Sequence, residues 1–115
     1  MNSFESLLVV GFMMVLLSLY IDAISTKVYR FYKPGCRFCQ ESQKEWDLFK
    51  SKCRFRGLKP IDINLEEKTP YNEALAKNFN VKSVPTIIKV SNSGEFSKYD
   101  GERTATQILD WCHNI

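Results

Sequence analysis

Residues 27–39 read KVYRFYKPGCRFC and combine a strand pattern, a turn and a pair of cysteines. Over residues 27–32, polar residues alternate with apolar or aromatic ones at the period of two that is typical of a β-strand. The turn Lys33-Pro34-Gly35 ends this strand, and Cys36 lies where a helix is expected to begin. A Cys-x-x-Cys pair that follows a strand and opens a helix indicates redox chemistry more specifically than its spacing alone.

The residues after Cys39 show further helix and strand patterns. These patterns predict helices over 36–52, 69–80 and 104–114, and strands over 59–65, 87–90 and 95–99. Two strands joined through a helix pair in parallel with a right-handed crossover, whereas the turn at 91–94 makes the last two strands an antiparallel hairpin. The sequence therefore predicts an α/β fold with a mixed four-stranded sheet and helices on both faces.

The N-terminal part of the chain is strongly apolar. Residues 7–21 read LLVVGFMMVLLSLYI, and with its edges the stretch covers 6–24. A helix that crosses a bilayer needs about 20 apolar residues, so we expect residues 1–25 to form an N-terminal transmembrane anchor and residues 26–115 to form the soluble domain. Two alternatives stay open, which are a signal peptide cleaved near Ala23-Ile24-Ser25 and a buried core helix.

The flanking charges give an expected orientation for a single-pass membrane protein. Basic residues follow the apolar segment within 27–37, and none precedes it. The positive-inside rule therefore places the soluble domain on the cytoplasmic side. Both a cellular and a viral membrane fit this pattern.

The charge pattern excludes a nucleic-acid-binding class. The chain has 115 residues and a formal net charge of +3, and its 16 Lys and Arg all follow residue 26. They are spread singly, with no dense basic run and no interleaving with aromatic residues. We expect protein partners and no nucleic acid.

The Cys36–Cys39 pair has the placement that thiol–disulfide exchange requires. A helix N-terminus presents unpaired N–H groups and a positive partial charge, which stabilise a thiolate. Cys36 would be the exposed nucleophile, and Cys39, one turn along, would resolve the mixed disulfide. Arg37 and Lys33 add positive charge nearby, so we expect a Cys36 pKa below the ordinary value.

The other cysteines leave alternatives open. A structural zinc site needs four ligands, and no second close pair accompanies Cys36 and Cys39, so we expect no metal and no other cofactor. Cys53 shares a predicted helix face with Trp46 and Phe49, and Cys112 follows Trp111. These two cysteines are either small buried hydrophobes or further redox thiols.

Residues 28–115 resemble the thioredoxin superfamily. Four segments carry the resemblance: FYKPGCRFC, IDIN, FNVKSVPTIIKV and YDGERTATQILDWC. The stretch 33–39 is also similar to glutaredoxins, although their Gly-Gly-Asp signature is absent from the sequence. The resemblance implies a thioredoxin-like fold and a cis Pro85 that faces Cys36 across a groove. It also implies Val84, Pro85 and Thr86 as substrate-binding residues.

The sequence departs from the thioredoxin pattern at the site itself. Gly35 stands where a tryptophan usually precedes the first cysteine, and Arg37-Phe38 replaces Gly-Pro between the cysteines. Arg30 occupies the strand position of a buried acidic residue, so the acid on which the family's usual proton relay to the second cysteine depends is missing.

The function predicted from these observations is a membrane-anchored thiol–disulfide oxidoreductase that acts on protein disulfides. Its partners would be protein disulfide or dithiol substrates and a redox partner that resets the pair. Two alternatives stay open, which are a non-catalytic membrane-tethered binding module and a secreted oxidoreductase released by signal cleavage.

Overall fold

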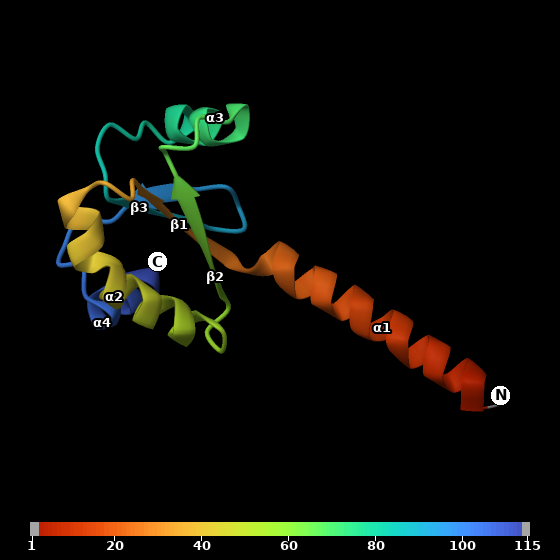
Figure 1. The fold of residues 1–115 in the computed structure, drawn as a ribbon. Coiled ribbons are helices and arrows are strands. Elements are labelled where there is room, and N and C mark those ends of the chain that lie inside the picture. Colours follow the sequence, from red (N-terminus) through yellow and green to blue (C-terminus); the bar gives the residue numbers. More distant parts are fainter. Residues whose placement is uncertain (1–2, 114–115) are drawn as a thin grey trace.

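The computed structural model describes residues 3–113, except for the side chains at positions 18 and 21–24. The chain forms, in order, α1 (Ser3–Ile24), β1 (Thr26–Tyr32), α2 (Arg37–Cys53), β2 (Leu58–Asn64), α3 (Pro70–Asn78), β3 (Thr86–Val90), β4 (Phe96–Lys98) and α4 (Ala105–His113) (Figure 1). The predicted order of elements after residue 26 is confirmed. The end of the predicted last helix, at residue 114, lies outside the described residues.

The four strands form one mixed sheet in the order β2-β1-β3-β4. The predicted parallel pairing of β1 with β2 and the predicted hairpin of β3 with β4 are both confirmed. β1 also pairs antiparallel with β3, which places β1 inside the sheet. Arg30, at the centre of β1, lies opposite Asp62 of β2 and Ile87 of β3.

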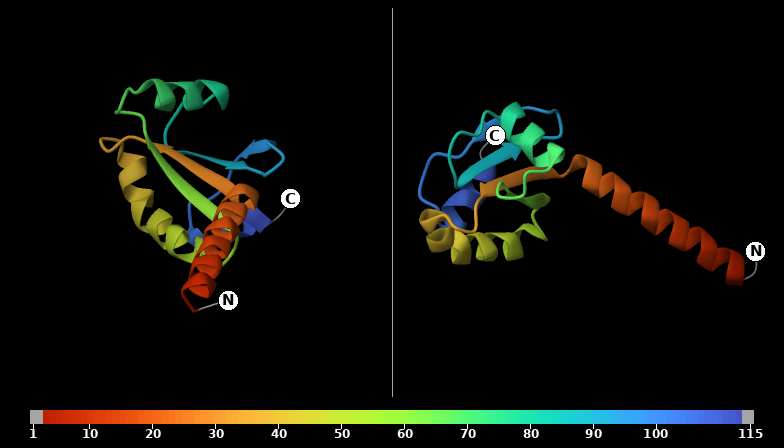
Figure 2. Two further views of the ribbon diagram at one scale, coloured as in Figure 1. Left: turned by 90° about the vertical axis from the view of Figure 1, so that its right-hand side faces the viewer. Right: turned by 45° about the horizontal axis from the view of Figure 1, so that its top comes forward.

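Helices cover both faces of the sheet, as the sequence predicted. α2 and α4 lie on one face, and α3 lies on the other (Figures 1 and 2). The alternation in β1 divides its side chains between the two cores, since successive residues of a strand point to opposite faces. Val28 packs in the α2–α4 core with Trp46 and Phe49, whereas Tyr29 and Phe31 pack on the side of α3.

Local signals set the ends of the helices. The hydroxyl of Thr69 accepts a hydrogen bond of 3.1 Å from the N–H of Asn72, and Pro70 follows it as the first residue of α3. Thr104 caps α4 in the same way, through the N–H of Gln107 at 3.3 Å. Gly57, just beyond α2, has a φ of +67°, a conformation that glycine adopts at no steric cost.

The apolar N-terminal stretch forms the helix α1, which projects away from the domain (Figures 1 and 2). Its large apolar side chains are exposed, from 44% for Leu16 to 71% for Leu7. This exposure excludes the core-helix alternative for that part of the chain. Among the residues that the structure describes, no helix is both long enough and apolar enough to cross a membrane. The expected transmembrane anchor is therefore not confirmed, and positions 18 and 21–24 of the expected span have no described side chains.

Candidate active site

Cys36 lies at the N-cap of α2, directly after the turn that ends β1. Its backbone is extended, with φ −82° and ψ 124°, and its N–H donates to the carbonyl of Lys33 at 3.0 Å. The N–H of Gly35 donates to the carboxylate of Glu66 at 3.1 Å, which ties this turn to the loop after β2. The cysteine is thus held at the helix tip by contacts on both sides of the turn.

The two sulfur atoms differ in exposure. Cys36 is half-buried, while Cys39 is 2% exposed and lies behind it in the first turn of α2. The Sγ of Cys36 accepts a hydrogen bond from the backbone N–H of Cys39 at 3.3 Å. One thiol is therefore open to an incoming disulfide and the other is shielded from solvent.

The pKa of Cys36 is lowered from its ordinary value, as the sequence predicted. The main causes are hydrogen bonds from the side chain and the backbone N–H of Cys39, followed by the backbone of Phe38 and the charge of Arg103. The source of positive charge differs from the prediction, which named Arg37 and Lys33. Arg37 is exposed, and its charge is paired with Glu41 at 3.0 Å.

The pKa of Cys39 is raised. Burial disfavours its thiolate, and its hydrogen bond to Cys36 acts in the same direction. A backbone hydrogen bond from Lys33 and the charge of Arg30 act the opposite way. The exposed cysteine is therefore the easier of the two to ionise.

The Val84–Pro85 peptide is cis, which confirms the expectation from the family resemblance. The Sγ of Cys36 lies 3.8 Å from the carbonyl oxygen of Val84, so the start of β3 does face the first cysteine. Thr86 is 6% exposed, and its hydroxyl donates to the carbonyl of Ser83 at 2.6 Å. Thr86 therefore holds the turn around the proline, and its hydroxyl is turned inward.

Two clefts flank the first turn of α2. One has a volume of about 310 Å³ and lies beside the buried cysteine; its lining is Tyr32, Lys33, Pro34, Cys39, Gln40 and Gln43. The other, of about 300 Å³, lies between α2 and the loop before α4, and Phe38 and Arg103 contribute to it. Phe38 is 59% exposed, so an apolar ring stands in the open next to the redox pair.

The family model that matches this chain is Thioredoxin, over residues 19–114. The chain belongs to the thioredoxin family. It is similar to protein disulfide-isomerase 1 of Caenorhabditis elegans, with 35% identity over 83 residues that cover 71% of this chain and 16% of that protein. It is also similar to human thioredoxin-related transmembrane protein 1, with 28% identity over 81 residues that cover 70% of this chain and 27% of that protein.

Solved structures show the same fold. The first thioredoxin domain of mouse protein disulfide-isomerase A4 has a TM-score of 0.66 and 24% identity, over 84% of this chain and 66% of that chain. The chain spans 16% of the nematode relative and 27% of the human one. The solved structure shows the fold alone, whereas the family model and the protein disulfide-isomerase relative support a thiol–disulfide oxidoreductase at the level of the family.

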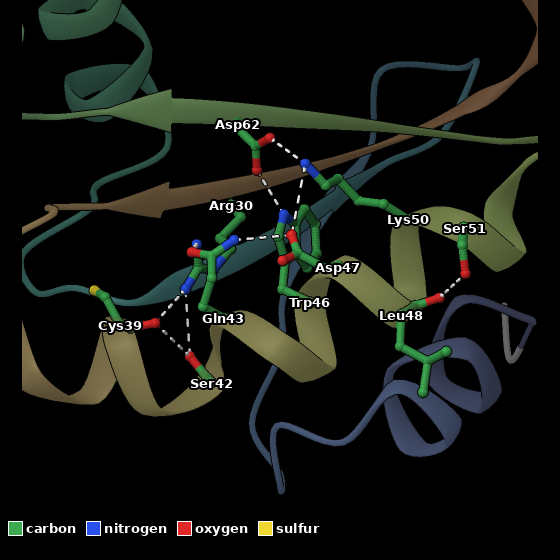
Figure 3. A network of polar contacts seen from close by, with 10 residues as sticks. All are labelled: Arg30, Cys39, Ser42, Gln43, Trp46, Asp47, Leu48, Lys50, Ser51 and Asp62. Atoms are coloured by element: carbon green, nitrogen blue, oxygen red, sulfur yellow. Dashed lines mark hydrogen bonds and ion pairs between the residues drawn. The ribbon is translucent and has the colours of Figure 1, made fainter.

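Arg30 departs from the thioredoxin pattern and contacts the site. It is 1% exposed, and its Nη2 donates to the carbonyl of Cys39 at 2.8 Å and to the hydroxyl of Ser42 at 3.3 Å (Figure 3). Its Nη1 donates to the side-chain oxygen of Gln43 at 3.0 Å. The sequence identified Arg30 only as the replacement of a buried acidic residue. The signal that could have placed it is its position two residues after Val28, on the strand face that packs against α2.

The two other cysteines of this thioredoxin domain lie in the core between α2 and α4. Cys53 is 1% exposed and Cys112 is 3% exposed. Burial raises the pKa of Cys53 to about 12 and that of Cys112 to about 11, so both thiols stay protonated at neutral pH. These values favour the interpretation as small buried hydrophobes. Within residues 3–113, no group of three or more His, Cys, Asp or Glu side chains is arranged to hold a metal ion.

Proposed function

We propose that this chain is a thiol–disulfide oxidoreductase that acts on disulfides of protein substrates through Cys36 and Cys39. The observation that carries the proposal is the pairing of a half-exposed sulfur of lowered pKa with a buried sulfur in the same helical turn. A thiolate at such a position attacks disulfides, and its neighbour is close enough to attack it in turn.

The reaction with a substrate disulfide has two steps. The thiolate of Cys36 attacks one substrate sulfur, so that a Cys36–substrate disulfide forms and the other substrate sulfur leaves as a thiolate. Cys39 then loses its proton to water and attacks the Sγ of Cys36. The Cys36–Cys39 disulfide forms, the second substrate sulfur leaves, and two electrons have passed from the cysteine pair to the substrate. A redox partner resets the pair.

We infer that an extended substrate segment lies against Cys36 and the adjoining turn at Val84 and Pro85. The proximity of the Val84 carbonyl to the Cys36 sulfur supports this assignment. Thr86 would contribute through its backbone, because its hydroxyl is occupied by Ser83. The exposed ring of Phe38 offers apolar contact on the other side of the cysteine.

A catalytic assay tests the proposed activity. The full chain is expected to accelerate the reduction of a protein disulfide such as that of insulin by dithiothreitol, and Cys36→Ser is expected to abolish the acceleration. Cys53→Ser is the matched control, because it removes a thiol from the core of the same domain. Loss of activity in both variants, or in neither, would contradict the assignment to Cys36.

We further propose that α1 attaches the domain to a membrane, with the domain on the cytoplasmic side as the flanking charges suggest. Large apolar side chains exposed along the described part of the helix support this, since water disfavours such a surface by about 25 cal/mol per Å². One relative is named a transmembrane protein. The full chain is expected to float with phospholipid vesicles, and a Val10→Asp, Leu17→Asp variant is expected to stay in solution. Equal flotation of both would contradict attachment through α1.

A further inference from the structure

A fully buried cation lies beneath the redox pair. Arg30 is 1% exposed and stands in the middle of β1, the strand that leads into the cysteine turn. A buried charge is costly unless hydrogen bonds compensate for it. The hydrogen-bond partners of Arg30 therefore indicate which part of the site this buried charge acts on.

The compensating groups of Arg30 are neutral. Its guanidinium donates to a backbone carbonyl, a hydroxyl and an amide oxygen, those of Cys39, Ser42 and Gln43 (Figure 3). The rings of Tyr32 and Trp46 lie 5.1 and 5.8 Å from its central carbon, within the range of cation–π attraction. Burial lowers the pKa of Arg30, but a guanidinium stays charged in proteins.

The carboxylates near Arg30 are occupied by another cation. Lys50 forms ion pairs with Asp62 at 2.8 Å and with Asp47 at 3.9 Å. Asp62 also accepts a hydrogen bond of 2.5 Å from the indole of Trp46. The two carboxylates share Lys50 and still act on Arg30 at longer range. The hydrogen bonds of the guanidinium go instead to the first turns of α2, and Cys39 is the ionisable residue among its hydrogen-bond partners.

The positive charge of Arg30 acts on the thiol of Cys39, whose carbonyl its guanidinium contacts. Burial and Cys36 disfavour the thiolate of Cys39, whereas a backbone hydrogen bond from Lys33 favours it. Arg30 also favours the thiolate, and its hydrogen bond to the Cys39 carbonyl fixes the first turn of α2 against the sheet.

We propose that Arg30 is a positioning residue for the resolving step, which holds Cys39 in place and supplies the positive charge that makes its thiolate accessible. The proposal rests on the proposed function, in which Cys39 attacks the mixed disulfide on Cys36. In that step the Cys39 thiol gives its proton to water, the S–S bond between Cys36 and the substrate breaks, and the Cys36–Cys39 bond forms. The leaving sulfur carries away the electron pair as a thiolate.

The two chemical steps can be observed separately with an aromatic disulfide. One equivalent of dithiobis-nitrobenzoate is mixed with the reduced full chain, and coloured thionitrobenzoate is followed by stopped flow. The first release reports the attack of Cys36, and the second reports the attack of Cys39 on the mixed disulfide. The rate of the second phase is measured against pH, and its midpoint gives the pKa of Cys39.

Three variants separate charge from structure. Arg30→Gln removes the charge, Arg30→Lys keeps it, and Gln43→Glu places a carboxylate against the guanidinium, 3.0 Å away in the native chain. Arg54→Gln is the matched control, because it removes an exposed arginine just beyond the end of the same helix. Circular dichroism checks that each variant is folded, and Gln43→Glu decides the question if Arg30→Gln does not fold.

The expected result is an upward shift of the second-phase midpoint in Arg30→Gln and Gln43→Glu only. Each unit of pKa increase should slow that phase at pH 7 by about three- to fourfold, because the tenfold loss of thiolate is partly offset by its greater nucleophilicity. Unchanged midpoints in both variants, or a shift in Arg30→Lys as large as in Arg30→Gln, would overturn the role of the charge. A missing first phase in the native chain would instead refute the proposed function.

Discussion

The Sγ of Cys36 accepts a hydrogen bond from the backbone N–H of Cys39 at 3.3 Å, and the side chain of Cys39 is buried directly behind it. This relationship makes the two thiols unequal, although they are only three residues apart. The exposed one is stabilised as an anion, and the buried one is not.

Cys36 should be the first thiol of the reduced chain to react with iodoacetamide. Because hydrogen bonds to its sulfur lower its pKa, the reaction rate should rise with pH to a plateau whose midpoint lies below the ordinary cysteine value of about 8.5. Peptide mapping after brief alkylation at a series of pH values measures this midpoint. A midpoint at or above the value of the unfolded chain would contradict the hydrogen-bonded geometry.

Cys53 and Cys112 should stay unmodified in the folded protein under the same conditions. Their pKa values of about 12 and about 11 leave almost no thiolate at pH 8, and their side chains are closed to solvent. Alkylation of both should appear only when urea unfolds the domain. Rapid modification of either residue in buffer would show that it is a redox thiol and not a core side chain.

The reduction potential of the Cys36–Cys39 couple should be less negative than that of thioredoxin, which is about −270 mV. Stabilising the Cys36 thiolate favours the reduced form of the pair, and this makes its disulfide more oxidising. Equilibration with glutathione buffers, followed by alkylation and mass analysis, gives the potential. A value below that of thioredoxin would mean that other contacts stabilise the disulfide more than these hydrogen bonds stabilise the thiolate.

The packing of α2 onto the sheet should determine the stability of the domain. Phe49 is fully buried beside Trp46 with ring centroids 4.9 Å apart, so Phe49→Ala should reduce the free energy of unfolding by about 3–5 kcal/mol. Urea unfolding followed by tryptophan fluorescence measures the change. Phe55→Ala is the control, since Phe55 is 88% exposed and should change stability by less than about 0.5 kcal/mol. Similar losses in both variants would contradict this assignment of the core.

Local patterns in the sequence predicted much of this fold. The alternation in β1, the Thr69-Pro70 cap and the turn before β4 each depend on neighbouring residues, and the structure has all three. The pairing of β1 with β3 was not predicted, because strand order depends on contacts between distant segments. The same limit applies to burial along α3. Ala74 is exposed, while Asn72 is buried and donates to the carbonyls of Asn64 and Glu67.

The sequence predicted that Cys36, Cys39 and Pro85 form the candidate site, but it did not predict which charges act on the cysteines. Sequence neighbours suggested Arg37 and Lys33 as the charges near Cys36. The structure instead brings Arg103, from the loop before α4, to Cys36 and Arg30, from β1, to Cys39. Charges act through space, and a residue between the two cysteines can point to solvent, as Arg37 does.

The most direct measurement traps the covalent intermediate. Cys39→Ser leaves the Cys36 nucleophile without its resolving partner, so a mixture of the full chain with a disulfide-containing protein should accumulate a mixed disulfide. Non-reducing electrophoresis and peptide mass analysis should find this bond at Cys36, and Cys36→Ser should form none. If Cys39→Ser captures no partner, or captures it through Cys53 or Cys112, then Cys36 is not the attacking sulfur.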